Sequence, residues 1–260
     1  MKNNNLDNIP FTYYGDLLGV SNYYRIDPDI AYDKLNFFYK ETYNVLRDIE
    51  RKKRNEYDFE VFLFSDSIFI TGTLLESTLR HLSYLYSILF NNNLLLRGAI
   101  VHGRLTFDPR IELRNIIKHL PKEDVLFRVV ELEKRNKGAR LVMEKKLAHL
   151  LLPKKWYTTE GYFKERIDPS IPKDSLLRKI RTTPSWSAYE FLWPLIDIQE
   201  FNGRQVKFYY TDFIKKINHL KRIVPEEALL NIKETKKMFD NIKPELDELY
   251  DLFFKNEKRK

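Results

Sequence analysis

Two aspartates stand where an aromatic or aliphatic run meets a turn, so their carboxylates could do chemistry. Asp16 follows the run Phe11–Tyr14 and precedes Leu17–Ser21, a turn that contains a glycine; Asp66 interrupts the apolar run Phe62–Ile70. A carboxylate at the edge of buried strands is usually held there for a cation or a charged ligand, because an uncompensated buried charge is costly. A glycine before a helix start also presents backbone N–H groups to phosphate. Asp66 could therefore hold a cation or a charged ligand, and Asp16 with its glycine turn could hold a cation and phosphate. The alternative for Asp16 is an ordinary junction between a strand and a turn.

The elements around Asp66 would position this site. Glu60–Gly72 has two apolar runs on either side of the polar tripeptide Ser65–Ser67, which predicts a tight β-hairpin or a strand with an acidic tip. A helix is indicated next by apolar residues spaced 4, 3, 4 and 3 apart, namely Leu75, Leu79, Leu82, Tyr86 and Leu89. Leu94–Leu105 then predicts a strand that carries Gly98 and Gly103. Together these elements form a β–β–α–β unit with an aspartate at its edge.

The segments on either side complete an α+β pattern. Before the hairpin, an amphipathic helix is indicated by the stripe Ala31, Leu35, Phe38, Thr42, Val45 and Ile49. After the strand, Glu123–Glu133 predicts a helix, Lys137–Met143 a strand and Glu144–Leu152 a short helix. This order predicts a ferredoxin-like α+β sandwich, with an antiparallel-rich sheet and helices on one face.

The composition changes after residue 152. Residues 153–210 contain five prolines and all three tryptophans with little periodicity, which predicts an irregular aromatic lobe or lid. Within it, Asn202-Gly203 predicts the turn of a hairpin over Phe201–Tyr210. Residues 211–260 are expected to be helical. We therefore divide the chain into a core (1–152), a lobe (153–210) and a C-terminal helical segment (211–260).

Composition narrows the classes of function. The 260 residues include no cysteine, which excludes disulfides, zinc–thiolate sites and thiol nucleophiles, and the five histidines lack the spacing of a metal site. No apolar run approaches the roughly 18 residues of a membrane span, and the first ten residues lack the apolar core of a secretory signal. We expect a cytoplasmic protein without a membrane partner. The formal net charge of +8 favours anionic ligands such as nucleotides and phosphates.

The two acidic motifs, taken with the glycine-bearing strand, resemble the catalytic domain of class III nucleotide cyclases. FTYYGDLLGVS (Phe11–Ser21) is similar to that family's first strand and turn, and FLFSDSIFI (Phe62–Ile70) to its hairpin with a second aspartate. LRGAIVHGRL contains Arg97–Gly103, which resembles the family strand Arg-x-Gly-Ile-x-x-Gly. The later segment Glu131–Ala148 resembles the dimerising helix and following strand. The resemblance covers about Phe11–Leu152, somewhat over half of the chain, and implies the family's palm fold.

The resemblance implies a two-metal reaction. Asp16 and Asp66 would bridge two Mg²⁺ or Mn²⁺ ions while the ribose 3′-hydroxyl of a nucleoside triphosphate attacks the α-phosphate and pyrophosphate leaves. The phosphates would be held by the turn residues Leu18, Gly19, Val20 and Ser21. The family also implies a homodimer with composite sites.

The sequence departs from the family where the helix should supply an Asn and an Arg to the substrate. When Glu131–Glu133 is aligned with the family's Arg-Leu-Glu, the two positions hold Phe127 and Glu131. Candidate substitutes are Arg97, Arg128 and Arg135. We take Arg97 as a catalytic candidate and Arg128 as a substrate-binding candidate, with a structural or surface role as the alternative for each.

A further departure lies four residues before the second aspartate, where the family's purine-reading Lys is replaced by Phe62. An aromatic ring there could stack on a base, and its alternative role is plain hydrophobic core. The pyrimidine-specific cyclases of bacterial Pycsar antiphage defence diverge in the same half of the domain. This resemblance implies UTP or CTP as the substrate and cUMP or cCMP as the signal.

Three hypotheses follow. The first is an active, divergent nucleotide cyclase. The second is a cyclase-fold protein that binds nucleotide or metal as a sensor or scaffold without turnover. The third is an unrelated basic adaptor or RNA-binding domain whose aspartates cap turns. The third finds no RNP-like aromatic strand or basic helix to support it, so nucleic acid is not an expected partner.

Overall fold

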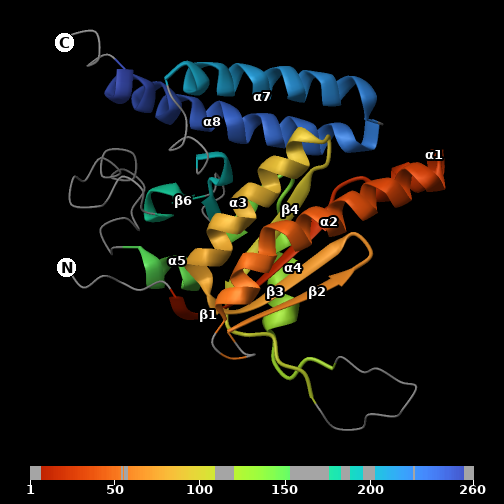
Figure 1. Cartoon of the computed structure of the whole chain (residues 1–260), viewed down its shortest axis with the longest axis vertical. Coiled ribbons are helices and arrows are strands. Elements are labelled where there is room, and N and C mark those ends of the chain that lie inside the picture. The colour runs from red at the N-terminus through yellow and green to blue at the C-terminus, as the bar shows by residue number, and fades with distance from the viewer. Residues whose placement is uncertain are drawn as a thin grey trace.

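A computed structural model describes residues 7–53, 55, 58–108, 120–152, 176–182, 188–195, 203–224 and 226–254. Its centre is a seven-stranded sheet in the order β2-β3-β1-β4-β5-β7-β6 (Figure 1). The strands are β1 (Asp7–Leu17), β2 (Phe59–Phe64), β3 (Ser67–Leu74), β4 (Leu96–His102), β5 (Leu141–Met143), β6 (Ile180–Thr182) and β7 (Tyr189–Phe191). Five of the neighbouring pairs are antiparallel, and β4 with β5 is parallel.

The α-helices of the described residues connect and cover these strands. They are α1 (Val20–Ile26), α2 (Pro28–Lys52), α3 (Leu75–Asn91), α4 (Val125–Lys134), α5 (Lys145–Leu151), α7 (Gly203–Ile223) and α8 (Leu229–Phe254). No described helix is both long and apolar enough to cross a membrane. The first four strands follow β–α–β–β–α–β connectivity with β1 and β3 at the centre, which is the ferredoxin-like arrangement. The predicted fold class is therefore confirmed.

The two faces of the sheet carry two apolar clusters, because side chains alternate along each strand. On one face, buried residues such as Tyr13 and Ile100 pack with α2 and α3. On the other face, Ala99 and Val101 pack with Val129 of α4. Figure 1 shows α2 and α3 in front of the sheet and α4 behind it. The expectation of helices on one face is therefore wrong in this respect: the connection from β4 to β5 places a helix on the second face.

The C-terminal helices lie side by side across one end of the sheet (Figure 1). The hairpin predicted over Phe201–Tyr210 is wrong, because α7 begins at Gly203. The local Asn-Gly turn signal is overridden by apolar residues at helical spacing, of which Phe213 packs against Phe90 and Phe239 with ring centroids 4.9 and 4.0 Å apart. Burial of this stripe outweighs the propensity of one dipeptide.

Part of the segment expected to be an irregular lobe belongs to the sheet. β7 pairs with β5 and with β6, and Trp193 directly after it is fully buried. The indole of Trp193 donates a hydrogen bond to the carbonyl of Ala139 (2.8 Å). Trp156, Trp186 and the prolines at 153, 169, 172 and 184 lie outside the described residues. The division of the chain into three units stays a prediction.

Two glycines face each other on β1 and β4 and leave room for tyrosine rings. Gly15 pairs with Gly98. A Cβ on Gly98 would lie 2.5 Å from the Tyr86 hydroxyl and 2.6 Å from the ring of Tyr13, and a Cβ on Gly15 would lie 2.2 Å from the Tyr13 hydroxyl. The two tyrosines are buried and hydrogen-bonded to each other (3.2 Å). Each glycine adjoins a residue of the candidate site, so tyrosine packing supports the backbone on which the site is built.

We predict that Gly98→Ala lowers the free energy of unfolding by about 1–3 kcal/mol, because the added methyl overpacks a filled core. Urea denaturation measures the loss. Tyr86→Phe removes the closest atom, so Gly98→Ala should cost less in that background. An equal cost in both backgrounds would show that the clash with Tyr86 is not the cause.

Candidate active site

Asp16 and Asp66 lie at the same end of the sheet, on neighbouring strands. Asp16 pairs with Ser67 across β1 and β3, and the N–H of the next residue, Leu17, donates to the carbonyl of Asp66 (2.9 Å). Asp66 occupies the two-residue turn between β2 and β3 with Ser65, whose φ of 54° lies in the left-handed region. The hairpin therefore brings its acidic tip beside the end of β1.

The carboxylate of Asp16 faces the α4 side of the sheet and has two polar neighbours. The hydroxyl of Ser67 donates to it (3.1 Å), and the guanidinium of Arg97 lies 3.9 Å away. Arg97 comes from β4, where it is the cross-strand partner of Asp16. Three strands thus contribute one polar side chain each to a single cluster.

Burial raises the pKa of Asp16 from its ordinary value of 3.8 to about 6. The charges of Asp66 and Glu133 raise the pKa further, whereas the hydrogen bond from Ser67 and the charge of Arg97 oppose the rise. The ionised carboxylate is therefore in an unfavourable environment that a divalent cation would relieve.

The oxygen donors of this end of the sheet fit Mg²⁺ or Mn²⁺. Magnesium is usually held by one or two carboxylates, with waters and substrate phosphates as its other ligands, and Asp16 and Asp66 supply two. Among the described residues, no group of three or more acidic, His or Cys side chains is placed to hold a metal ion. The pair suits a cation that arrives with a phosphorylated substrate better than an all-protein metal cage.

Glu133 is a member of the cluster that the sequence prediction missed. It lies on α4, is 2% exposed, and forms an ion pair with Nε of Arg97. Arg97 also donates through Nη1 to the carbonyl of Asn136 (3.3 Å). A usable signal was present in the sequence, because Glu133 continues the spacing of Val125 and Val129 and so places an acid on the apolar stripe of the helix.

The expected phosphate-binding turn directly follows Asp16. Gly19 has a φ of 84° and precedes α1, which begins at Val20 and includes Ser21. The expectation for the amide of Leu18 needs correction, because its N–H donates to the carbonyl of Leu95 (2.8 Å) as an extension of the pairing of β1 with β4. A phosphate role for this turn therefore stays a prediction for Gly19, Val20 and Ser21.

Phe62 lies on the Asp16 face of the sheet. It is the cross-strand partner of Phe69, which in turn pairs with Tyr14. The rings of Tyr14 and Phe69 are stacked with centroids 4.6 Å apart, and Phe62 contacts Phe107 edge-on at 5.6 Å. An aromatic row therefore crosses three strands, starting two residues from Asp16.

Arg128 does not lie with the cluster. It donates to the carbonyl of His102 (2.9 Å) and forms ion pairs with Glu144 (2.5 Å) and Asp124 (3.1 Å). His102 is five residues from Arg97 along β4, which corresponds to about 17 Å. The substrate-binding role expected for Arg128 is not supported by this placement, because its partners tie α4 to the opposite end of β4.

We predict that Asp16→Asn stabilises the metal-free protein at neutral pH. The folded state raises the pKa of Asp16 to about 6, so the wild type loses stability relative to the variant as pH rises from about 4 to 6. Urea unfolding in EDTA should show a stability difference that grows over this window and is constant above it. In an Asp66→Asn background the folded state raises the pKa of Asp16 less, so the growth should end at a lower pH and the final difference should be smaller. A difference independent of pH would contradict the assignment.

Comparison with known proteins gives likeness in structure alone. No family model and no curated protein matches the chain. The guanylyl cyclase Cya2 is similar over 55% of this chain and 79% of its own, with 13% identity and a TM-score of 0.44. The adenylyl cyclase CyaB from P. aeruginosa is similar over 55% of this chain and 79% of its own, with 12% identity and a TM-score of 0.41. The guanylate cyclase domain of RhGC from Catenaria anguillulae, in complex with GTP, is similar over 57% of this chain and 84% of its own, with 9% identity and a TM-score of 0.45. Identities and scores this low transfer no activity to the chain.

Proposed function

We propose that the chain is a nucleotidyl cyclase that converts a nucleoside triphosphate into a 3′,5′-cyclic nucleotide and pyrophosphate. The ribose 3′-oxygen forms a bond to the α-phosphorus, the bond to the β-phosphate oxygen breaks, and the hydroxyl proton passes to solvent. The observation that carries the proposal is the meeting of Asp16 and Asp66 across β1 and β3, with the pKa of Asp16 raised in part by the charge of Asp66.

Different residues of the site would have different roles in this reaction. Asp16 and Asp66 would hold Mg²⁺ or Mn²⁺, which lowers the pKa of the attacking hydroxyl and neutralises phosphate charge. Arg97 carries a positive charge next to the carboxylates, where it can stabilise charge that develops on the pentacoordinate phosphorus. Gly19, Val20 and Ser21 would position the β- and γ-phosphates at the start of α1.

We extend this proposal to the base of the substrate, the biological role, the location and the oligomeric state. Phe62 and the aromatic row beside it offer rings on which a base can stack, and the family's purine-reading Lys is missing, so we propose UTP or CTP as the substrate. From the same resemblance we propose a role in antiphage defence and a homodimer with composite sites, and from the composition we propose a cytoplasmic location. Phe127 on α4 is 69% exposed and available for a partner protomer to cover.

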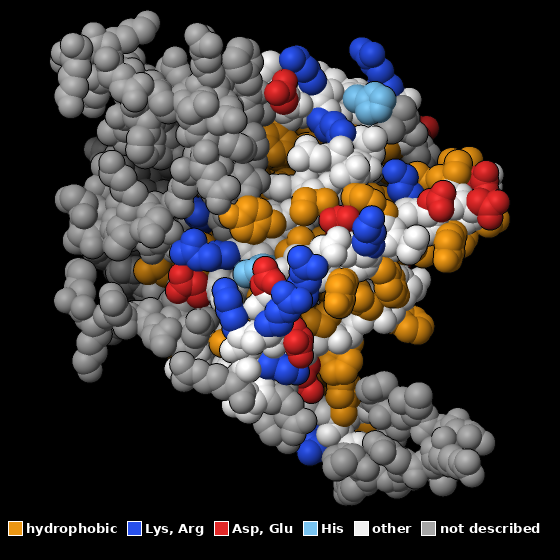
Figure 2. Space-filling view, in the orientation of Figure 1, with side chains coloured by type: hydrophobic (Ala, Val, Ile, Leu, Met, Phe, Trp, Pro, Cys, Tyr) orange, Lys and Arg blue, Asp and Glu red, His pale blue; other side chains and the backbone are white. Residues whose placement is uncertain are grey.

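The alternative is a cyclase-fold protein without turnover that binds nucleotide or metal. It is favoured by a difference from the family on α4: Phe127 and Glu131 stand where the family carries Asn and Arg. The carboxylate of Glu131 lies 3.9 Å from the guanidinium of Arg135. An RNA-binding adaptor has less support. On the face drawn in Figure 2, the Lys and Arg side chains of the described residues are interspersed with Asp and Glu and form no continuous basic stripe.

We predict that wild-type protein with Mn²⁺ releases pyrophosphate and a cyclic nucleotide from one or more of the four ribonucleoside triphosphates. Mass spectrometry identifies the product and its base. Asp16→Asn and Asp66→Asn should each abolish product formation, because each removes a metal ligand. Asp247→Asn, on an exposed ion pair of α8, is the control and should keep wild-type activity.

The alternative makes a different prediction. If wild type gives no product with any triphosphate but Mn²⁺ and nucleotide still raise its melting temperature, the protein is a binder without turnover. The stabilisation should then be absent in Asp16→Asn and retained in Asp247→Asn. Product formation that survives Asp16→Asn would overturn both forms of the proposal.

A further inference from the structure

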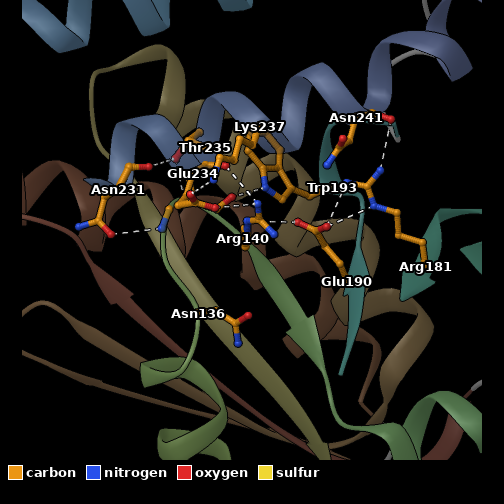
Figure 3. Close-up of polar contacts among 12 residues, drawn as sticks. Asn136, Arg140, Arg181, Glu190, Trp193, Asn231, Glu234, Thr235, Lys237 and Asn241 are labelled. Carbon is orange, nitrogen blue, oxygen red and sulfur yellow. Dashed lines mark hydrogen bonds and ion pairs between the residues drawn. The ribbon is translucent and has the colours of Figure 1, made fainter. Parts of the chain in front are cut away.

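The segment between α4 and β5 connects the candidate site to the last helix of the structure. At one end of this segment, the carbonyl of Asn136 accepts a hydrogen bond from Arg97 (3.3 Å). Two residues later, the N–H of Gly138 donates to the side-chain oxygen of Asn231 in α8 (3.2 Å). The N–H of Ala139 donates to the hydroxyl of Thr235, also in α8 (2.9 Å). Figure 3 shows α8 lying along this segment with these side chains turned toward it.

The approach of α8 is so close that it requires a glycine. Gly138 has a φ of 82°, and a Cβ at this position would lie 2.7 Å from the backbone nitrogen of Thr235 and 3.0 Å from the carbonyl oxygen of Asn231. Thr235 is fully buried, and its hydroxyl also donates to the carbonyl of Asn231 (2.7 Å). The hydroxyl therefore has one partner inside its own helix and one on the segment.

Arg140 continues the connection into the sheet. Its carbonyl accepts the N–H of Gly98 (2.9 Å), the residue directly after Arg97. Its guanidinium lies 3.7 Å from Glu190 and 3.4 Å from Glu234 of α8. The side chain of Arg97 is thus bound by the carbonyl of Asn136, and the residue after Arg97 is bound by the carbonyl of Arg140.

A buried ion network fixes the position of α8 against the strands. The side chain of Glu190 is 1% exposed and binds both Arg140 and Arg181. Arg181 in β6 also donates to the carbonyl of Asn241 in α8 (3.3 Å) (Figure 3). Buried ion pairs add little net stability, because desolvation offsets their attraction, but unpaired buried charges are costly. The network therefore penalises any displacement of α8 that would separate these partners.

We propose that Thr235 and Asn231 of α8 are positioning residues for Arg97. Their side chains accept hydrogen bonds from the N–H groups of residues 138 and 139, which follow Asn136 and the end of α4 along the chain. The carbonyl of Asn136 and the carboxylate of Glu133 in turn bind the Arg97 guanidinium beside Asp16. The inference rests on the proposed function for the role of Arg97 in the reaction. A charge that stabilises a transition state must be placed within a fraction of an ångström, so loosening a support outside the site should slow the reaction.

Thr235→Val tests this role, because it keeps the shape of the side chain and removes the hydroxyl that accepts from Ala139. The readout is the Arg97 Nε–H signal in a ¹⁵N-correlation NMR spectrum, assigned by its loss in Arg97→Lys. We expect the signal to shift or broaden in Thr235→Val and to keep its wild-type position in Thr235→Ser, which restores the hydroxyl. We also expect kcat to fall by roughly 10–100-fold with little change in KM, since the interaction acts on the transition state.

Thr78→Val in α3 is the matched control. Thr78 is also fully buried, and the bond made by its hydroxyl goes to the carbonyl of Leu74, at the start of its own helix (2.8 Å). This variant should lose a helical hydrogen bond but leave the Arg97 signal and kcat unchanged. It separates general destabilisation from the specific link between α8 and the segment.

The possible outcomes separate the two proposals. If Thr235→Val lowers the melting temperature but leaves the Arg97 signal in place, the positioning role is overturned. If the signal moves while wild type forms no cyclic nucleotide from any triphosphate, the positioning role stands and the proposed activity fails. If wild type is active and kcat changes equally in Thr235→Val and Thr78→Val, the effect is general and the positioning role is again overturned.

Discussion

The charge of one guanidinium, that of Arg97, is shared between two acidic side chains that come from different elements. Glu133 reaches it from α4, and Asp16 lies beside it on β1. The charge of Asp66 also acts on Asp16, so the negative charges of Asp16, Glu133 and Asp66 outnumber the positive charge of Arg97. Proteins tolerate such an excess where a positively charged ligand completes it. Three features hold these charged side chains together: the register of β1 with β3 and β4, the turn that carries Asp66, and the packing of α4, which carries Glu133.

The sequence was sufficient for the central elements because their signals are local. The hairpin around Asp66 was readable from a polar tripeptide between apolar runs, and α2 and α3 from apolar stripes with a spacing of three and four residues. The adjacency of Asp16 and Asp66 was expected from the resemblance to class III nucleotide cyclases, in which the two corresponding aspartates bind the metal ions together. Glu133 could not be placed in the same way, since its pairing with Arg97 depends on which face of the sheet α4 covers.

Where the predictions failed, tertiary contacts decided the structure. The Asn-Gly dipeptide at 202–203 favours a turn, but α7 forms there because Phe213, Ile217 and Leu220 bury themselves against the body. The substrate-binding role of Arg128 stays a prediction, but its ion pairs with Asp124 and Glu144 could be seen only in three dimensions. The amide of Leu18 is used by the backbone of Leu95, which no side-chain pattern reveals.

The hydrogen bonds from residues 138 and 139 to α8 span 93 and 96 positions of the chain, and this separation bears on biosynthesis. A ribosome adds roughly 5–20 residues per second, so α8 emerges on the order of 5–20 s after the segment that it contacts. During this interval the strands that carry the aspartates can already pair, because their contacts are closer in sequence. A translation product that stops before α8 lacks the partners of Gly138, Ala139 and Arg140, whereas the partners of the strands beside Asp16 and Asp66 are already synthesised.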